Sequence, residues 1–596
     1  MSNVIATQNR IMSDLIVDFC WDVLEDSRLP LVVCTTLVGV LTVYIGRKFY
    51  VRRQFKQKVR KKNEERQQAF QDVLKSLNTD DKEVEDTRKA VLSLTLPQLS
   101  QQLRDGQLSA VQVLQAYQEK ALAVHNDFNC ITEPIPDALA RAEDLDRAGQ
   151  RSGLLYGVPV SIKDNIDIKG MANTLGLVKY LENYAEEDSV IVRVLKKQGA
   201  VPFVKTNVPQ TMLDIGCSNP LYGTTLNPRD PTRSPGGSSG GEGALIGGGG
   251  SILGLGNDIG GSIRIPAHFC GICGFKPTAN RLSKQGYFNC SPGQQGVVGT
   301  CGPLARDVNS LALVMKALLV PDMFELDPLV PPIPFRQEIY ESKKPLKIGY
   351  FLDWELQLAT PALTRAVKIA KEALEKAGHK LVPFQPPKSD HAFFDIIPKC
   401  LLADGGTTIR NRMSGEVVDP RLKLQLPFLT MSYFWRKVVG VLLKPVSARI
   451  ARMMSHRILR TIYDLWQRLV EREVYVREFL TAWEEADIDV LLCPAFPIPA
   501  FKLQGAPALS ETTSYTFIFN LLDFPAGVVP VTKVMEEDDR LLDDYVGSNN
   551  DLFDRYLRQV TKGAVGLPVA VQCVALPWQE EICLRLMKEV ETVCKM

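Results

Sequence analysis

The sequence predicts an α/β fold in which helices cover both faces of a central β-sheet. Short apolar, β-rich runs alternate with longer helical patterns from Leu96 onward, and this alternation is typical of such a fold. The 596 residues are 45% hydrophobic and 23% charged, so the chain can bury a large core and is not a disordered protein. The runs that predict buried strands are Val158–Lys163, Lys347–Leu352, Val490–Cys493, Gly527–Val534 and Leu567–Val574, and Ala362–Ala377 predicts a helix.

The overall composition excludes several classes of protein. Lys and Arg total 70 against 68 for Asp and Glu, so the net charge of +2 gives no general attraction to nucleic acid. The 13 cysteines are scattered, which excludes a small disulfide-bonded scaffold. With only five histidines in the chain, a catalytic base of another type is favoured.

A membrane anchor is predicted near the N-terminus. Residues 29–46 form an 18-residue stretch without a charge, long enough as a helix to span about 27 Å of a hydrocarbon core of about 30 Å. A signal peptide or a buried core helix are the alternatives. The preceding residues 1–28 carry five acidic residues rather than a short basic region, which favours a transmembrane helix.

The charges around this stretch predict its orientation. Residues 47–62 contain nine basic residues and no acidic one, which places the bulk of the chain in the cytosol and residues 1–28 on the lumenal side. Residues 47–95 are polar and helix-prone and predict a stalk. Residues 96–596 are then the catalytic domain.

Glycine makes up 15 of the 39 residues between Gly236 and Gly274, which predicts tightly folded loops with inward-pointing amides. A phosphate-binding loop lacks its consensus here. Residues 236–240 (GGSSG) match the GxSxG pattern of Ser-His-Asp hydrolases, with His268 among the later histidines. The third interpretation rests on two serine-bearing loops, GGSSGG at 236–241 and DIGGSIR at 258–264, with a lone lysine upstream in GVPVSIKDNI.

This last arrangement resembles the amidase signature family. The similarity continues through GFKPT and GPLARDV, and beyond this block the chain looks like the membrane-anchored animal branch of the family over most of residues 96–596. The resemblance implies an amidase signature α/β fold with a central mixed sheet. It also implies a serine hydrolase that uses no metal and no organic cofactor.

Carried over residue by residue, the resemblance implies a Ser-Ser-Lys triad. Ser262 is the expected nucleophile, and Ser238, expected to follow a cis peptide bond with Gly237, relays protons to Lys163. The oxyanion hole is expected to consist of four backbone amides, those of Ile259, Gly260, Gly261 and Ser262.

The chemistry of a lysine base sets a condition on its surroundings. A free lysine is charged near pH 7 and cannot accept a proton, whereas burial among apolar side chains favours its neutral form. Val158, Pro159, Val160 and Ile162 are the expected apolar sleeve, and an ion pair with Asp164 or Asp167 is the alternative. Activity should then rise with pH as Lys163 loses its proton.

Further residues take their expected roles from the same resemblance. Ser239 would hydrogen-bond within the triad network, Asp258 and Arg264 would brace the loop, and Met212 would line an acyl pocket together with Ser238. Asn257 departs from the family, whose members usually carry threonine there. This departure leaves the geometry of the oxyanion loop open.

The CxxC at Cys270 and Cys273 has no second pair at zinc spacing, so we predict packing and no metal site. A basic segment, residues 421–460, predicts a second membrane contact. It has nine basic residues and no acidic one, and apolar residues at helical spacing form one face. A helix packed on the core or at a dimer interface is the alternative. The expected membrane-binding cap includes Phe434, Trp435, Val438 and Leu442.

For this branch, the resemblance implies hydrolysis of long-chain fatty acid primary amides and N-acylethanolamines to a fatty acid plus ammonia or ethanolamine. It also implies a homodimer on endoplasmic reticulum or Golgi membranes, in contact with membrane lipids. Two alternatives stay open: a family member that acts on other amides or transfers ammonia, and a membrane scaffold without activity.

Overall fold

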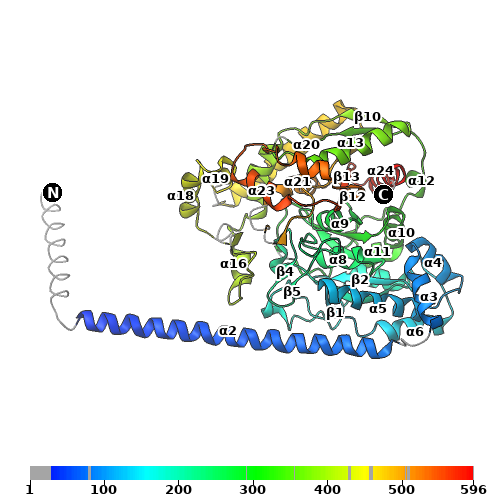
Figure 1. Ribbon diagram of the computed structural model, residues 1–596, viewed down its shortest axis with the longest axis horizontal. Helices are drawn as coiled ribbons and strands as arrows, with labels where there is room; N and C mark the ends of the chain where they lie inside the picture. Colours follow the sequence, from blue (N-terminus) through cyan, green and yellow to red (C-terminus); the bar gives the residue numbers. More distant parts are fainter. Residues whose placement is uncertain are drawn as a thin grey trace. The chain divides into compact units, whose positions relative to one another are not determined.

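The computed structural model describes residues 29–77, 82–289, 291–354, 356–423, 425–426, 431–454, 459, 461–503, 505 and 510–594. The chain divides into two compact units, residues 1–62 and 63–596. Figure 1 shows the helices and strands with their labels.

Helix α2 (Leu29–Ser76) contains the segment predicted to cross a membrane. The predicted lumenal tail, residues 1–28, lies outside the described residues, as do most side chains of residues 29–46. No helix among the described residues is both long enough and apolar enough to cross a bilayer. The structure therefore gives the predicted transmembrane helix no support.

The second unit begins earlier than the predicted domain boundary at residue 96. The last part of α2 and helix α3 (Lys82–Ser93) belong to it. Phe70, Leu77 and Val91 are buried, and Arg66 donates a hydrogen bond to Asn129 Oδ1 at 2.9 Å. Part of the predicted stalk is thus packed on the folded unit, because apolar side chains interrupt its polar sequence.

A single 11-stranded sheet forms the centre of the second unit, in the order β1-β3-β2-β6-β8-β7-β12-β13-β11-β9-β10. The β3-β2-β6 and β11-β9-β10 groups are parallel, and the other neighbours are antiparallel. The prediction of a mixed sheet is therefore confirmed. The strands are β1 (Ile131–Pro134), β2 (Pro159–Lys163), β3 (Val201–Thr206), β6 (Leu253–Asp258), β7 (Cys273–Lys276), β8 (Thr300–Ala305), β9 (Lys347–Tyr350), β10 (Lys380–Pro383), β11 (Val490–Pro494), β12 (Ala526–Lys533) and β13 (Pro568–Val574), with β4 (Ser218–Asn219) and β5 (Gly223–Thr224) forming a separate pair.

The five predicted strands correspond to β2, β9, β11, β12 and β13, and the predicted helix to α13. The helices of the unit are α4 (Leu96–Arg104), α5 (Ala110–Phe128), α6 (Ala138–Ala148), α7 (Val190–Lys197), α8 (Gly240–Gly247), α9 (Arg264–Cys270), α10 (Val308–Leu318), α11 (Pro321–Leu326), α12 (Gln337–Tyr340), α13 (Pro361–Lys376), α14 (Ser389–His391), α15 (Ile397–Leu401), α16 (Thr407–Met413), α18 (Tyr433–Leu443), α19 (Ala448–Met454), α20 (Ile462–Glu485), α21 (Ser514–Leu521), α22 (Glu536–Leu541), α23 (Leu552–Thr561) and α24 (Glu580–Val593).

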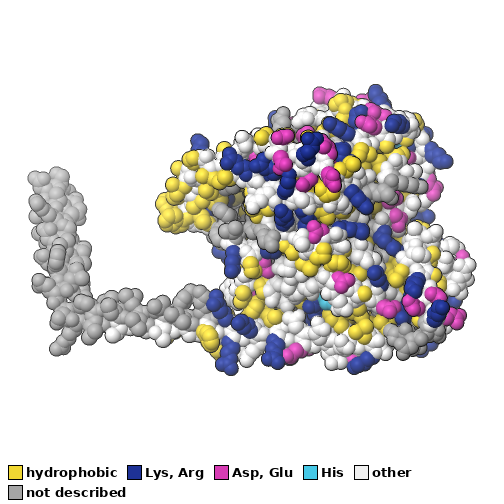
Figure 2. All heavy atoms as spheres, viewed as in Figure 1, with side chains coloured by type: hydrophobic (Ala, Val, Ile, Leu, Met, Phe, Trp, Pro, Cys, Tyr) yellow, Lys and Arg dark blue, Asp and Glu magenta, His cyan; other side chains and the backbone are white. Residues whose placement is uncertain are grey.

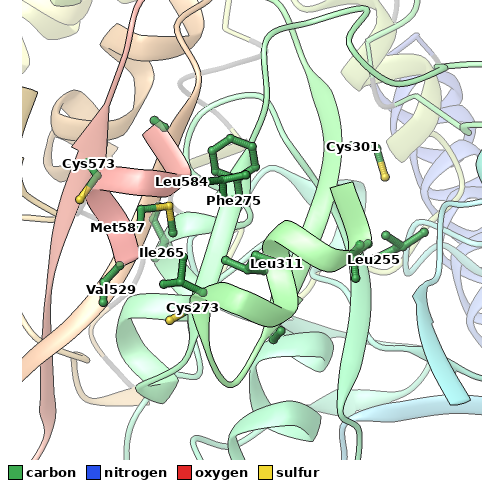
Figure 3. Packing of buried hydrophobic residues seen from close by; sticks show 14 of the residues in the cluster. Leu255, Ile265, Cys273, Phe275, Cys301, Leu311, Val529, Cys573, Leu584 and Met587 are labelled. Atoms are coloured by element: carbon green, nitrogen blue, oxygen red, sulfur yellow. The ribbon is translucent and has the colours of Figure 1, made fainter. Parts of the chain in front are cut away.

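Helices cover both faces of the sheet. On one face Val528 of β12 and Ala570 of β13 are buried in one cluster with residues of α8 and α9. On the other face, Gly527 lies close enough to Met587 of α24 that a Cβ on it would meet the Met587 sulfur at 2.2 Å. Successive residues of a strand point to opposite faces, so these two contacts lie on opposite sides of β12. Figure 3 shows Met587 and Leu584 packed beside Phe275 and Val529.

The predicted membrane-binding cap contains α18 and α19, whereas residues 424, 427–430, 455–458 and 460 lie outside the described part. Phe434, Trp435 and Leu442 of α18 are 66%, 59% and 70% exposed, and Figure 2 shows hydrophobic side chains gathered over this helix. Val438 is half-buried. Arg436 turns inward, and its guanidinium donates to the Met453 carbonyl at 3.2 Å. The apolar face is thus largely exposed at Phe434, Trp435 and Leu442 among the described residues.

Candidate active site

The candidate active site lies at the carboxyl ends of two neighbouring parallel strands. Lys163 is the last residue of β2, and Asn257 and Asp258 end β6. The loop after β6 carries Ser262 into α9, and the loop before α8 carries Ser238. This topology brings together three chain segments that are far apart in the sequence.

Lys163 is fully buried and makes two hydrogen bonds within the site. Its Nζ donates to Ser238 Oγ at 2.8 Å and to Asn257 Oδ1 at 2.5 Å. The carboxylate of Asp164 instead accepts hydrogen bonds from Thr174 and Leu175. The hydrogen bonds of Lys163 to Ser238 and Asn257 thus favour a place in the site over the alternative of an ion pair with Asp164.

The residues of the predicted apolar sleeve are buried, but two of them do not face Lys163. Val160 and Ile162 are buried, but strand alternation places their side chains on the face opposite Lys163. On the face of Lys163 lies Ser161, whose hydroxyl donates to the carboxylate of Glu242 at 2.6 Å. Sequence analysis missed this polar surrounding because residues from three separate segments form it.

The Gly237–Ser238 peptide bond is cis, as the resemblance implied. Gly237 is required here by close approach, because a Cβ on it would lie 2.0 Å from the Gly216 carbonyl oxygen. The next residue, Ser239, donates from its backbone amide to the Ser262 carbonyl at 3.1 Å, and its hydroxyl donates to the Asn257 carbonyl at 3.4 Å. Ser239 thereby joins the two serine loops.

Ser262 and Ser238 line the same cavity, which has a volume of about 230 Å³. The apolar part of the cavity wall includes Ile259 and Met212, which belongs to the short helix Gln210–Met212. Met212 also packs in a buried cluster with Leu175 and Ile409. Sequence analysis did not identify the polar part of the lining, which comes from Asn165, Lys284, Tyr287, Asn289, Gln294, Gln295 and Thr300.

Three of the four amides expected in the oxyanion hole point to no acceptor in the described protein. These are the amides of Ile259, Gly260 and Ser262, whereas the Gly261 amide donates to Asp258 Oδ1 at 2.7 Å. The Gly261 amide thus helps to hold the loop. A further support is Thr516, whose hydroxyl donates to the Gly260 carbonyl at 2.5 Å.

Asp258 and Arg264 form a fully buried ion pair, with 2.9 Å between Arg264 Nη2 and Asp258 Oδ1. The same carboxylate accepts from the Ile263 amide at 3.1 Å. Burial acts to raise the pKa of Asp258, but the Arg264 guanidinium and its hydrogen bonds hold it well below its usual range. Arg264 also donates to the Thr516 carbonyl and to Gln572 and Asn520, which ties the loop to α21 and β13.

The histidine and cysteines that could have indicated a Ser-His-Asp site or a metal site have structural partners. His268 is held through both ring nitrogens, by the Ile498 carbonyl and the Ala570 amide at 3.1 Å each. Burial lowers its pKa to about 4. Cys270 and Cys273 are buried free thiols, and the Cys273 thiol donates to Glu591 at 3.7 Å. The described residues contain no cluster of ligands that could hold a metal ion.

Comparison with known proteins agrees with this geometry. The amidase family model matches residues 112–584.

The chain belongs to the amidase family.

Two relatives of this amidase carry the name fatty acid amide hydrolase 1. The protein from Sus scrofa is 46% identical over 84% of this chain and 86% of its own length. The protein from Caenorhabditis elegans is 37% identical over 86% of this chain and 92% of its own. Among solved structures, a fatty acid amide hydrolase superposes with a TM-score of 0.76 and 26% identity, covering 91% of this chain and 95% of that one. This amidase is therefore a hydrolase that acts on amides.

Proposed function

We propose that this amidase hydrolyses long-chain fatty acid primary amides and N-acylethanolamines to a fatty acid plus ammonia or ethanolamine. The observation that carries the proposal is the hydrogen bond of 2.8 Å from buried Lys163 to Ser238, beside a cavity that Ser262 also lines. The names of the relatives support the substrate class.

In the proposed mechanism, neutral Lys163 accepts the proton of Ser238 while Ser238 takes the proton of Ser262. Ser262 Oγ bonds to the amide carbonyl carbon, and the carbonyl electron pair moves onto oxygen. The proton then returns from Lys163 through Ser238 to the leaving nitrogen, and the C–N bond breaks. Water, activated by the same relay, hydrolyses the acyl-enzyme.

The developing oxyanion would be bound by backbone amides of the loop after β6. The amides of Ile259, Gly260 and Ser262 have no protein acceptor in the described structure and can donate to it. Donors fixed before the reaction lower the barrier most, and the ion pair between Asp258 and Arg264 fixes this loop.

We also propose that the enzyme works at a membrane. The exposed Phe434, Trp435 and Leu442 on basic segment 421–460 suit the interface of an anionic leaflet, beside which a lipid amide would enter. Residues 29–46 would anchor the chain in the endoplasmic reticulum or Golgi, with the catalytic domain in the cytosol. Replacing Phe434 and Trp435 with Ser in a chain lacking residues 1–46 should abolish liposome binding, and unchanged binding would disprove the cap.

A homodimer is proposed on the exposed apolar stripe of α20. Ile462, Trp466, Val470 and Val474 recur at every fourth position and are each at least half exposed. A second copy of the chain would cover them. Val470→Glu should convert the detergent-solubilised enzyme to monomers in sedimentation, and an unchanged mass would place the dimer contact elsewhere.

The test of the activity compares a long-chain N-acylethanolamide with a short-chain amide, using detergent-purified full-length protein. We expect a strong preference for the long chain that disappears in Ser262→Ala, together with fluorophosphonate labelling of Ser262. Equal turnover of the short amide would keep the amidase but remove the lipid assignment. No turnover and no labelling would favour an inactive scaffold.

A further inference from the structure

Glu242, in the first turn of α8, is a fully buried carboxylate that the mechanism above does not use. Both of its oxygens accept hydrogen bonds from hydroxyl groups. Ser161 Oγ donates to Oε2 at 2.6 Å, and Thr206 Oγ1 donates to Oε1 at 2.7 Å. A buried carboxylate is costly, so its position beside the active site calls for a role.

The strands place this carboxylate on the side of Lys163. Ser161 lies two residues before Lys163 in β2 and therefore on the same face. Thr206 is the residue of β3 that pairs directly with Lys163. Glycine at position 254 leaves the space, because a Cβ there would lie 1.9 Å from Glu242 Oε2.

Four further groups that interact with Lys163 are neutral at neutral pH. Ser238 and Asn257 accept its hydrogen bonds. The thiols of Cys217 and Cys301 interact electrostatically with it, but burial raises the pKa of each to about 12.

Two neighbouring charged groups have other partners. The carboxylate of Asp164 is held by Thr174 and Leu175, and the ammonium of Lys205 donates to Asn173 Oδ1 at 2.6 Å. Glu242 differs, because the charge of Lys163 acts on it directly. Burial raises the pKa of Glu242 to about 7, while its hydrogen bonds and Lys163 oppose that rise. Since the charge of Lys163 lowers this pKa, the carboxylate is most readily ionised while Lys163 carries its proton.

We propose that Glu242 is a positioning residue that supplies the counter-charge for Lys163. The inference rests on the proposed Ser-Ser-Lys function. When the proton of Ser262 has moved through Ser238 to Lys163, the site holds a buried ammonium and an oxyanion. The carboxylate of Glu242 stays ionised, takes no proton itself, and stabilises the ammonium until the proton leaves for the amine.

The charge has a definite effect on the pH profile. An anion close to an ammonium favours the protonated lysine, so Glu242 shifts the deprotonation of Lys163 to higher pH. In Glu242→Gln this attraction is gone. The rising limb of kcat/KM against pH should therefore move to lower pH, by at most the roughly 1–3 units that an adjacent opposite charge produces. The plateau of kcat should fall about threefold to tenfold for each pH unit by which the limb moves, because the lysine is then the weaker base.

The experiment measures kcat and KM from pH 5 to 10 for the full-length enzyme, Glu242→Gln and a matched control. Glu591→Gln is that control, because burial also raises the pKa of Glu591 to about 7, but this residue of α24 accepts a hydrogen bond from the Val308 amide at the start of α10. In the control, kcat/KM should rise over the same pH range as in the unmodified enzyme. The rate of fluorophosphonate labelling of Ser262 against pH gives the same limb without a substrate.

An unchanged limb in active Glu242→Gln would overturn the proposal, whatever happens to kcat. If Glu242→Gln does not fold, Thr206→Val replaces it. Removing one donor disfavours the ionised carboxylate, so the limb should again move to lower pH, by a smaller amount, and a fixed limb there would also overturn the proposal. Retained activity in Ser262→Ala would contradict the proposed function itself, which is a different result.

Discussion

Asp258→Asn tests whether the loop after β6 depends on its buried ion pair. The substitution keeps the shape of the side chain but removes its charge and half of its acceptor capacity. Arg264 is fully buried, so its guanidinium would lose its ionic partner without access to water. Removing one partner of a buried ion pair typically costs about 3–5 kcal/mol. A typical unfolding free energy is about 5–15 kcal/mol, so this decrease in stability should be readily measurable.

The assay is guanidinium-induced unfolding followed by tryptophan fluorescence, with the Ser262 labelling rate measured on the same samples. Glu537→Gln is the control, since it breaks an ion pair with Arg540 that is exposed on both sides and should change the stability little. Because the pKa of Asp258 is depressed in the folded state, its contribution is complete above about pH 4 and is lost below it. The difference in unfolding free energy between the unmodified enzyme and Asp258→Asn should therefore shrink only at acid pH. If Asp258→Asn costs no more than Glu537→Gln, the ion pair does not hold the loop.

Three further predictions follow from single contacts. Asn257→Leu should lower kcat/KM at least about tenfold because Lys163 loses an acceptor, whereas Asn257→Thr should retain most activity; equal effects would show that the acceptor is unimportant. Thr516→Val removes the hydrogen bond to the Gly260 carbonyl and should lower kcat with little change in KM, and a change confined to KM would contradict this. The pKa of His268 is lowered to about 4, so folding keeps it neutral and its stabilisation is lost as pH falls below about 6.5; the unfolding free energy should drop by up to about 3 kcal/mol between pH 6.5 and 4, and less in His268→Gln.

The sequence predicts those parts of the molecule that local patterns determine. The buried strands and α13 follow from runs of apolar residues whose spacing is visible in the chain. Ser238 and Ser262, two residues of the proposed triad, lie in glycine-rich loops whose motifs resemble the amidase family, and Lys163 ends one of the apolar runs. Even the close approach at Gly237 has a visible signal, because glycine is the residue that tolerates it.

Contacts between distant segments are not visible in this way. The polar surroundings of Lys163 combine Ser161, Thr206 and Glu242, which lie on β2, β3 and α8. Helical spacing predicts the apolar face of α18, but it treats Arg436 as solvent-exposed although the side chain turns inward to Met453. Whether a charged side chain of such a helix is buried depends on the segment that packs against it, which local spacing does not reveal.

Residues 257–264 show why this segment tolerates so little change. Asn257 accepts a hydrogen bond from Lys163, Asp258 and Arg264 fix the loop, and Ser262 has to reach the cavity from a connection of only five residues, 259–263. Gly261 makes that connection possible with a φ of 117°, a conformation that side-chain-bearing residues rarely adopt, and a Cβ there would also lie 2.5 Å from Thr516 Oγ1. The contact to the proposed base, the stability of the loop and the orientation of the proposed nucleophile therefore depend on one short segment, residues 257–264. A substitution within it should affect stability and catalysis together, whereas Glu242 lies outside it and its substitution should be recognised by the shift of the pH profile that accompanies the lower kcat.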